Sequence, residues 1–330
     1  MRRSKSTKSG LANGNAMKVC VAALLLASAS ANSQESPASE FVTLGTVGGP
    51  VANAERAQPA NALVVGKDVY LVDAGDGAVQ QLAAAGIPLI RVRGVFLSHL
   101  HFDHTGGLLA VLGLRTQLGL PGTLTVYGPQ GTRELVDGLL VGMRPAMEAA
   151  FGIPGQTWTP RIEVRELTDQ STVELGEFIA RSATNSHYSF VPESPEYEHF
   201  ESLSYRFDLP DRSIVYTGDT GPSANVVKLA EKADLLVSEI INVEAVMESI
   251  RIARPDLGPV ELQDAERHLA NHHLRPCDVG ELASEAEVGA VVVTHIVPAS
   301  LDNDVIATFG EGVRACFDGD VFVARDLDRF

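Results

Sequence analysis

Four side chains that can bind a metal ion lie within six consecutive positions of this chain: His99, His101, Asp103 and His104. They follow a short apolar run, residues 95–97, that is typical of the end of a buried strand. In an extended segment His99 and His101 point to the same side, so one cation can contact both. Where the strand ends the chain turns, and Asp103 and His104 can then face a second cation. This donor set suits zinc, with iron or manganese as alternatives.

A two-metal centre needs more ligands than this segment supplies, and three residues further along the chain can provide them. His187, Asp219 and His295 each lie within three residues after the end of a predicted strand. We expect His187 to complete a three-histidine set with His99 and His101. The glycine before Asp219 allows close backbone approach, so that its carboxylate can bridge both cations, and His295 gives the second cation a further ligand.

The fold that positions these residues has strands and helices interspersed along the whole chain. Alternating and fully apolar runs predict strands, and apolar residues near helical spacing predict helices. The predicted strands are residues 41–46, 61–65, 68–72, 124–127, 162–166, 178–184, 203–207, 214–217, 235–238, 290–294 and 321–324. The predicted helices are residues 77–85, 108–118, 132–151, 224–232, 260–271, 277–286 and 304–315. Periodicity alone therefore assigns the chain to the α/β or α+β class.

The pattern His-x-His-x-Asp-His after a hydrophobic strand resembles the metallo-β-lactamase superfamily of metallohydrolases. The resemblance spans roughly residues 41–300. It implies a four-layer αββα sandwich, with two sheets face to face and helices outside. It also implies that Asp73, at a strand end, supports the histidine loop from behind the metal ligands, the alternative being a simple turn with an Asp cap.

Asp219 also distinguishes branches within this superfamily. The true β-lactamases lack a bridging aspartate, so its presence favours the ribonuclease Z, phosphodiesterase, arylsulfatase, lactonase and glyoxalase II branches. Three segments, residues 126–131, 216–225 and 233–239, are similar to the ribonuclease Z and arylsulfatase-like group.

That group carries a further histidine, in a His-x-Thr pattern, upstream of the last strand. The corresponding segment here is His272-His273-Leu274-Arg275, which places His273 on that histidine and Arg275 where threonine is usual. The resemblance implies that His273 donates a proton or hydrogen bond to charge developing on the substrate. Alternatively, His272 and His273 only end a helix, where cations are favourable.

Residues 1–31 have the three regions of a secretory signal peptide: basic residues, an apolar run and a small-x-small cleavage site. Met17 could be the true start, and the alternative is a disordered tail with an apolar core segment. We therefore expect a polar linker at 32–40, a hydrolase domain at 41–330, a secreted or periplasmic location and no stable membrane anchor.

The chain is acidic, with a formal net charge of −16; removal of residues 1–31 would take away five positive charges and bring it to −21. Because phosphate binding needs basic patches, this charge predicts that nucleic acid is not a partner. A basic Gly-Pro-rich insertion that would grip a transfer RNA precursor is not found either, which disfavours tRNA processing. The mature chain keeps Cys277 and Cys316, which could form a disulfide or stay as buried thiols.

Together these features predict a secreted dinuclear zinc hydrolase in which a metal-bound hydroxide attacks an ester. Asp103 would bind metal and orient the nucleophile, and His273 would assist the leaving group. The expected substrate is a small-molecule ester, of arylsulfatase-like or phosphodiesterase-like type. The alternatives are a lactonase or β-lactamase, a non-catalytic metal-binding module on the same fold, and a redox di-iron protein, whose branch typically has glutamate in place of His101. A homodimer is left open.

Four aromatic residues are candidates for the wall of a substrate pocket. Tyr188, Tyr197, Phe200 and Trp158 could line it, but aromatic residues in such loops are as often packing. The stretch 242–259 could be a lid or a surface helix.

Overall fold

The computed structural model describes residues 39–299 and 303–330, so the predicted signal peptide and most of the predicted linker lie outside the described residues. The described strands alternate their side chains between two environments. In β3 (Asp68–Ala74), Leu71 packs in a cluster with helices, whereas its neighbour Val72 packs against residues of a second sheet. This period of two is the geometric consequence of an extended backbone, and it places each sheet between two apolar layers.

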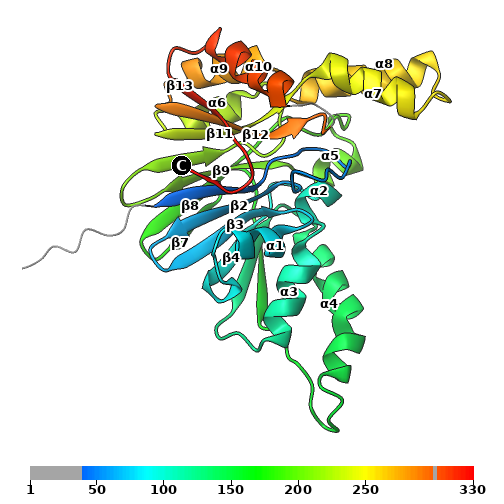
Figure 1. Cartoon of the computed structure of the whole chain (residues 1–330), viewed down its shortest axis with the longest axis vertical. Helices are drawn as coiled ribbons and strands as arrows, with labels where there is room; N and C mark the ends of the chain where they lie inside the picture. Colours follow the sequence, from blue (N-terminus) through cyan, green and yellow to red (C-terminus); the bar gives the residue numbers. More distant parts are fainter. Residues whose placement is uncertain (1–38, 300–302) are drawn as a thin grey trace, which may run out of the picture. The chain divides into compact units, whose positions relative to one another are not determined.

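The first sheet has seven strands in the order β14-β1-β2-β3-β4-β5-β6 (Figure 1). The pairs from β14 to β3 are antiparallel, and those from β3 to β6 are parallel. Its other strands are β1 (Glu40–Gly45), β2 (Ala60–Val65), β4 (Val92–Phe96), β5 (Leu124–Gly128), β6 (Ile162–Glu166) and β14 (Asp328–Arg329).

The second sheet also has seven strands, in the order β13-β12-β11-β10-β9-β8-β7. It repeats the scheme of the first, since the pairs from β7 to β10 are antiparallel and those from β10 to β13 are parallel. Its strands are β7 (Thr172–Leu175), β8 (Phe178–Thr184), β9 (Leu203–Asp208), β10 (Ser213–Tyr216), β11 (Leu235–Ile241), β12 (Ala290–Val297) and β13 (Asp320–Val323).

Helices cover the outer face of each sheet. The larger helices beside the first sheet are α1 (Ala78–Ala84), α3 (Leu108–Gln117) and α4 (Thr132–Ala149), and those beside the second are α6 (Ala224–Ala230), α9 (Pro276–Glu285) and α10 (Asn303–Arg314). This layering produces three apolar clusters. One lies between each sheet and its helices, and one lies between the two sheets. The four-layer αββα sandwich predicted from the resemblance is therefore confirmed.

The remaining helical segments are short connections and one helical pair. They are η1 (Leu89–Arg91), α2 (Phe102–Thr105), α5 (Pro195–His199), α7 (Val243–Ala253) and α8 (Pro259–His272). The stretch predicted as either a lid or a surface helix forms α7, which packs on α8 around Met247 and Leu262 (Figure 1). No helix in the described part of the chain is long and apolar enough to span a bilayer.

The topology brings the carboxyl ends of many strands to one edge of the two sheets. Strands β3 and β4 run parallel in the first sheet, as do β10, β11 and β12 in the second. Strand β8 also runs in the same direction as β10, because both are antiparallel to the strand β9 between them. Residues that follow these strands are thus collected at that edge, where ligands of open α/β sheets usually bind.

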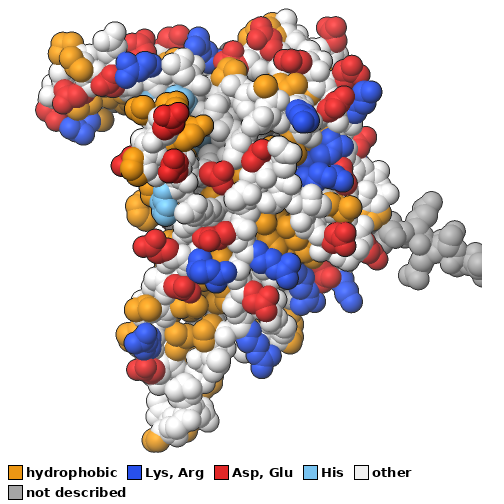
Figure 2. All heavy atoms as spheres, turned by 180° about the vertical axis from the view of Figure 1, so that it is seen from behind, with side chains coloured by type: hydrophobic (Ala, Val, Ile, Leu, Met, Phe, Trp, Pro, Cys, Tyr) orange, Lys and Arg blue, Asp and Glu red, His pale blue; other side chains and the backbone are white. Residues whose placement is uncertain are grey.

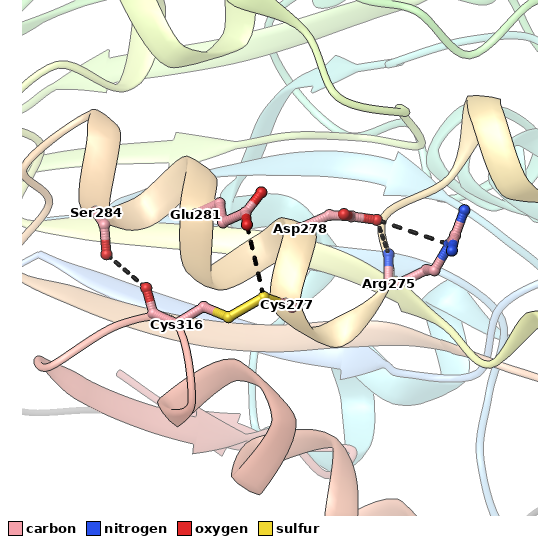
Figure 3. Close-up of a disulfide and its surroundings, with 6 residues drawn as sticks. All are labelled: Arg275, Cys277, Asp278, Glu281, Ser284 and Cys316. Carbon is pink, nitrogen blue, oxygen red and sulfur yellow. Dashed lines mark hydrogen bonds and ion pairs between the residues drawn. A yellow bond between two sulfur atoms is a disulfide. The ribbon is translucent and has the colours of Figure 1, made fainter.

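A disulfide joins Cys277 and Cys316, whose Cα atoms are 5.4 Å apart (Figure 3). The bond ties the first turn of α9 to the chain just after α10. Nearby, the Ser284 hydroxyl donates a 2.7 Å hydrogen bond to the Cys316 carbonyl. Of the two alternatives left open by the sequence, the structure has the disulfide.

We predict that C277S or C316S alone lowers the free energy of unfolding by about 4 kcal/mol, because the bond closes a loop of 39 residues in the unfolded chain. Urea unfolding followed by circular dichroism measures this loss. S284A is the control, since it removes only the neighbouring hydrogen bond and should cost about 1 kcal/mol. Equal urea midpoints for the wild-type chain with and without reductant would contradict the prediction.

Candidate metal centre

The first group of donors consists of three histidine side chains. His99 follows β4, His101 precedes α2, and His187 follows β8. The Nδ1 atom of His101 lies 3.0 Å from Nε2 of His99 and 3.1 Å from Nε2 of His187. Nitrogen ligands about 2.0–2.1 Å from one tetrahedral cation are roughly 3.3 Å apart, so these three atoms are spaced as ligands of a single ion.

The second group combines a carboxylate with two histidines. The one-turn helix α2 buries Asp103 and His104 side by side, and His295 comes from the carboxyl-terminal part of β12. The Asp103 Oδ2 atom lies 3.5 Å from Nε2 of His104 and 3.6 Å from Nε2 of His295. These residues also form a group whose ligand atoms all lie within 4.8 Å of one another.

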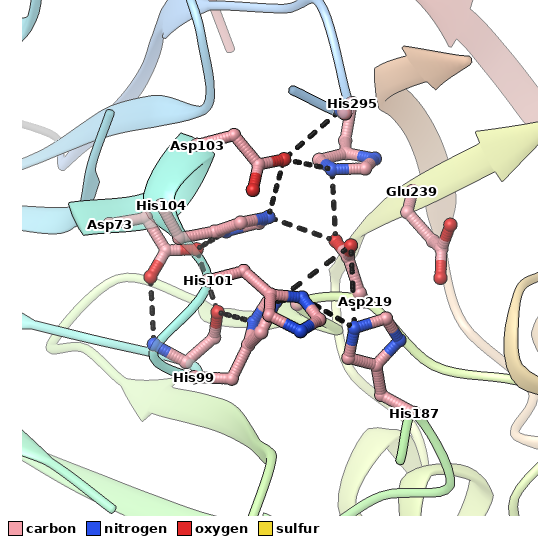
Figure 4. Close-up of polar contacts among 12 residues, drawn as sticks. Asp73, His99, His101, Asp103, His104, His187, Asp219, Glu239 and His295 are labelled. Carbon is pink, nitrogen blue, oxygen red and sulfur yellow. Dashed lines mark hydrogen bonds and ion pairs between the residues drawn. The ribbon is translucent and has the colours of Figure 1, made fainter. Parts of the chain in front are cut away.

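Asp219, just after β10, lies between the two groups (Figure 4). Its Oδ1 atom is 3.3 Å from Nε2 of His104 and 3.1 Å from Nε2 of His295. Its Oδ2 atom faces the other group, 4.0 Å from Nε2 of His99 and 3.9 Å from Nε2 of His187. One carboxylate therefore presents one oxygen to each group, as a bridging ligand does.

The chemistry of these donors fits bound cations. Nε2 of His104, Oδ1 of Asp219 and both ring nitrogens of His295 are buried and make no hydrogen bond to the described residues. Buried polar atoms are normally satisfied, so such a concentration of unsatisfied atoms calls for a ligand in the space they face. All seven side chains predicted as metal ligands line that space: His99, His101, Asp103, His104, His187, Asp219 and His295.

The pKa shifts of four of these side chains suit metal binding, whereas Asp219 raises the pKa of His104 and of His295, so these two imidazoles must lose a proton when a cation binds. Burial lowers the pKa of His99 and of His187 well below the usual value, so both imidazoles are neutral and keep a lone pair for a cation. Burial alone would raise the pKa of Asp103, but His104 and His295 lower it to about 2. The pKa of Asp219 is likewise lowered, against the effect of burial, by His295 and His104.

Asp73 supports the metal-binding loop from behind. Its Oδ2 atom lies 2.7 Å from Nδ1 of His104 and accepts hydrogen bonds of 2.8 Å from the hydroxyls of Ser98 and Tyr216. Its Oδ1 atom accepts a 2.7 Å bond from the Ser98 amide. Because Nδ1 of His104 is engaged by Asp73, Nε2 is directed to the centre, which is the supporting role that the resemblance implied.

His273 lies against the first group of donors. Its ring centroid is 4.9 Å from that of His187, and it shares a potential metal-binding group with His187 and Asp219. Its Nδ1 atom is 2.7 Å from Oε2 of Glu239. Burial alone would lower the pKa of His273, but the Glu239 carboxylate raises it to about 9. His273 is therefore a buried imidazolium at neutral pH. Since its Nδ1 atom faces Glu239, its Nε2 atom is the one available to donate a hydrogen bond.

Glu239 is a residue whose role sequence reasoning missed. It is 1% exposed in strand β11, which is apolar apart from Glu239 and the neighbouring Ser238, and its Oε1 atom accepts a 2.5 Å hydrogen bond from the Thr220 amide. It thus connects His273 with the loop that carries Asp219. The sequence did contain one indication of this role, namely a glutamate next to a predicted apolar strand. A buried carboxylate within a strand is rarely tolerated without a partner.

Backbone conformation also shapes the loops of the site. Gly218 has a φ of +60°, and a Cβ atom there would lie 2.7 Å from that of Ser98, so glycine is required, as expected from the sequence. Asp73 and His295 adopt positive φ angles of 61° and 45°, which are uncommon for residues with side chains. Such conformations are maintained at functional sites by the surrounding structure.

Two residues near His273 lie outside the donor groups. His272 contacts the backbone carbonyl of Ser186 through Nδ1. Arg275 contacts Asp278 and the Ala270 carbonyl on the surface (Figure 3). Of the two adjacent histidines, it is therefore His273 that faces the donors.

Solved structures share this fold. The metallo-beta-lactamase fold protein YhfI from Bacillus subtilis superposes with a TM-score of 0.61 at 20% identity, covering 88% of this chain and 98% of that one. The short form of human tRNase Z superposes with a TM-score of 0.62 at 18% identity, with the same coverages. At these identities the likeness concerns the fold.

A relative of higher identity changes the expected substrate. Ribonuclease Z from Mycobacterium marinum is 30% identical over 303 residues, which cover 88% of this chain and 97% of that protein. The expectation of an arylsulfatase-like or phosphodiesterase-like enzyme for small-molecule esters is contradicted by this similarity, as is the exclusion of nucleic acid as a partner. The expectation was wrong because net charge is a sum over the whole molecule and does not describe where individual charges lie. On the face that Figure 2 shows, basic side chains occur at several places among the acidic ones.

The family itself follows from a match over most of the chain. Residues 69–296 match the model of the beta-lactamase superfamily domain. This range begins in β3 and ends in β12, so it contains all seven predicted ligands as well as Asp73, Glu239 and His273. The chain belongs to the metallo-β-lactamase superfamily, and its relatives lie in the ribonuclease Z branch.

Proposed function

We propose that this protein is a metal-dependent ribonuclease that hydrolyses phosphodiester bonds in RNA. The observation that supports the substrate is the 30% identity to a ribonuclease Z over 97% of that protein's length. The arrangement of the seven donors supports hydrolysis, but it is common to superfamily members with different substrates. The similarity over nearly the whole length of that relative therefore carries the assignment to RNA.

We propose two zinc ions as the cofactor, with iron or manganese as the alternatives. Five imidazoles and two carboxylates form a donor set that suits zinc. His99, His101 and His187 would hold one ion, and Asp103, His104 and His295 the other, with Asp219 between them. When bound, such ions activate water as a nucleophile and polarise a phosphoryl oxygen.

The chain's own residues would then orient the reactants and move protons. The Gly49 amide donates a 3.0 Å hydrogen bond to Oδ2 of Asp103. This contact supports a carboxylate that would bind a cation and orient the attacking water. His273, protonated at neutral pH, would donate its Nε2 proton to the oxygen that leaves phosphorus. Glu239 would hold the ring of His273 in place and maintain its charge.

We also propose that the protein is exported, as residues 1–31 predict. The Cys277–Cys316 disulfide supports an oxidising compartment, since such bonds are rare in the reducing cytosol. Fusion of residues 1–40 to a phosphatase reporter that is active only after export tests this proposal, and an inactive fusion would contradict it.

The function is tested with purified, zinc-loaded protein and four substrates: a transfer RNA precursor, an unstructured RNA, a bis-aryl phosphate and an aryl sulfate. We expect cleavage of RNA, abolished by a chelator and restored by zinc. H99A should lower kcat/KM for RNA at least 100-fold, because it removes a ligand. R275A is the matched control, since Arg275 is an exposed residue near His273 that contacts none of the donors.

Metal content is measured on the same preparations. About two zinc ions per chain in the wild type and fewer in H99A are expected. Turnover of the aryl sulfate with no cleavage of any RNA would overturn the proposed substrate, and a chain with two iron atoms would overturn the proposed metal.

A second prediction concerns Glu239 and the pH dependence of kcat/KM. The pKa of His273 is raised to about 9 by Glu239, so the donor form persists at neutral pH and is lost as pH rises through that value. E239Q removes the negative charge that raises this pKa. The alkaline limb of the profile should therefore move to lower pH in E239Q, with the largest loss of activity above neutrality.

H273A is the companion variant for this measurement. It should lower kcat about 10²- to 10⁴-fold, the usual contribution of a general acid. If E239Q keeps the wild-type alkaline limb, Glu239 does not control the donor. Circular dichroism of both variants shows whether they remain folded.

A further inference from the structure

A row of three aromatic rings leads away from the candidate metal centre. Tyr188 directly follows His187, and its ring centroid lies 5.3 Å from that of His187 and 5.4 Å from that of His101. The Phe190 ring is 5.3 Å from Tyr188, and the Phe200 ring is 5.8 Å from Phe190. We call Tyr188, Phe190 and Phe200 the aromatic track.

Packing in the core does not account for these rings. None of the four apolar clusters of the described residues includes a member of the track. Phe200 is 38% exposed, and Tyr188 and Phe190 are partly exposed. Partly exposed aromatic rings that adjoin a catalytic site are available to bind a ligand with flat, apolar faces.

The segment that carries the track is held at both ends. The Ser189 hydroxyl lies 2.6 Å from Nδ1 of His268 on α8. At the other end, the Gln130 amide nitrogen lies 3.1 Å from Nδ1 of His199, whose ring packs on Phe200 at 4.6 Å. The rings are therefore positioned before a ligand arrives, which reduces the conformational entropy lost on binding.

We propose that the aromatic track binds unpaired bases of the RNA substrate next to the phosphate that is cleaved; this inference rests on the proposed ribonuclease activity. The ring spacing determines how the bases lie. A base inserted between two rings needs two stacking gaps of about 3.4 Å, and the 5.3 and 5.8 Å spacings are too small for that. The bases therefore stack on the exposed faces of the rings, as on single-strand binding proteins.

The charge of the same segment favours contact through bases over contact through phosphates. Glu193, Glu196 and Glu198 lie between Phe190 and Phe200 and are exposed. Carboxylates repel the phosphate backbone, so this part of the surface would contact the flat faces of the bases while the metal centre binds the phosphate. Affinity that arises from stacking depends less on salt than affinity that arises from phosphate contacts.

The test compares F190A, F200A and F200L with F200Y, using an RNA substrate that has an unpaired segment across the cleaved bond. F190A and F200A should raise KM about tenfold and leave kcat within about twofold, because the track binds bases and does not touch the reacting atoms. F200L keeps apolar bulk but lacks a ring face, so it should resemble F200A, whereas F200Y should resemble the wild type. F151A is the matched control, since Phe151 is 68% exposed and lies outside the track.

A second substrate separates stacking from a structural effect. Replacing the unpaired nucleotides beside the cleaved bond with abasic ones should raise KM for the wild type and remove the difference between wild type and F200A. The F200A effect should also persist at low and at high salt.

Two results would overturn the proposal, and they are distinguishable. If the wild type cleaves RNA and the track variants have unchanged KM, the track is not a base-binding site but the proposed function stands. If the wild type cleaves no RNA at all, the proposed function fails and the inference fails with it.

Discussion

The candidate metal centre depends on one buried carboxylate that lies between two groups of donors. Asp219 is 3% exposed, and its two oxygens face different groups of donors. A charge so buried is costly unless it is compensated, and the surrounding histidines and the cations they can hold provide that compensation. Several neighbouring features hold the Asp219 carboxylate and the histidines in position. They are the left-handed backbone at Gly218, the contact of Asp73 with His104, and the buried pair of Glu239 and His273.

Much of the fold and of the donor set could be predicted from the sequence, for local reasons. His99, His101, Asp103 and His104 lie within six consecutive positions, so their spacing alone indicates a metal site. The strands can be predicted because short apolar runs such as residues 290–293 in β12 are rich in β-branched residues. The αββα layering came from the family resemblance, since periodicity does not specify how two sheets pack.

Other features could not be found from one sequence because they depend on long-range contacts. Glu239 and His273 are separated by 33 intervening residues, and the motif that suggested His273 gave no partner for it. The aromatic track is similar: Tyr188 and Phe200 were recognised as candidates, but Phe190, which connects them, was not. The substrate was predicted wrongly because net charge describes the sum of the surface, whereas RNA binding depends on local groups.

The two sheets repeat one pairing scheme, and each contributes only part of the metal site. The chain after β4 in the first sheet supplies His99, His101, Asp103 and His104, whereas the second sheet supplies the other three donors. Neither half can therefore form either site alone, since each predicted triad draws on both. It follows by thermodynamic linkage that the free energy of cation binding is also free energy of association between the two halves of the sandwich.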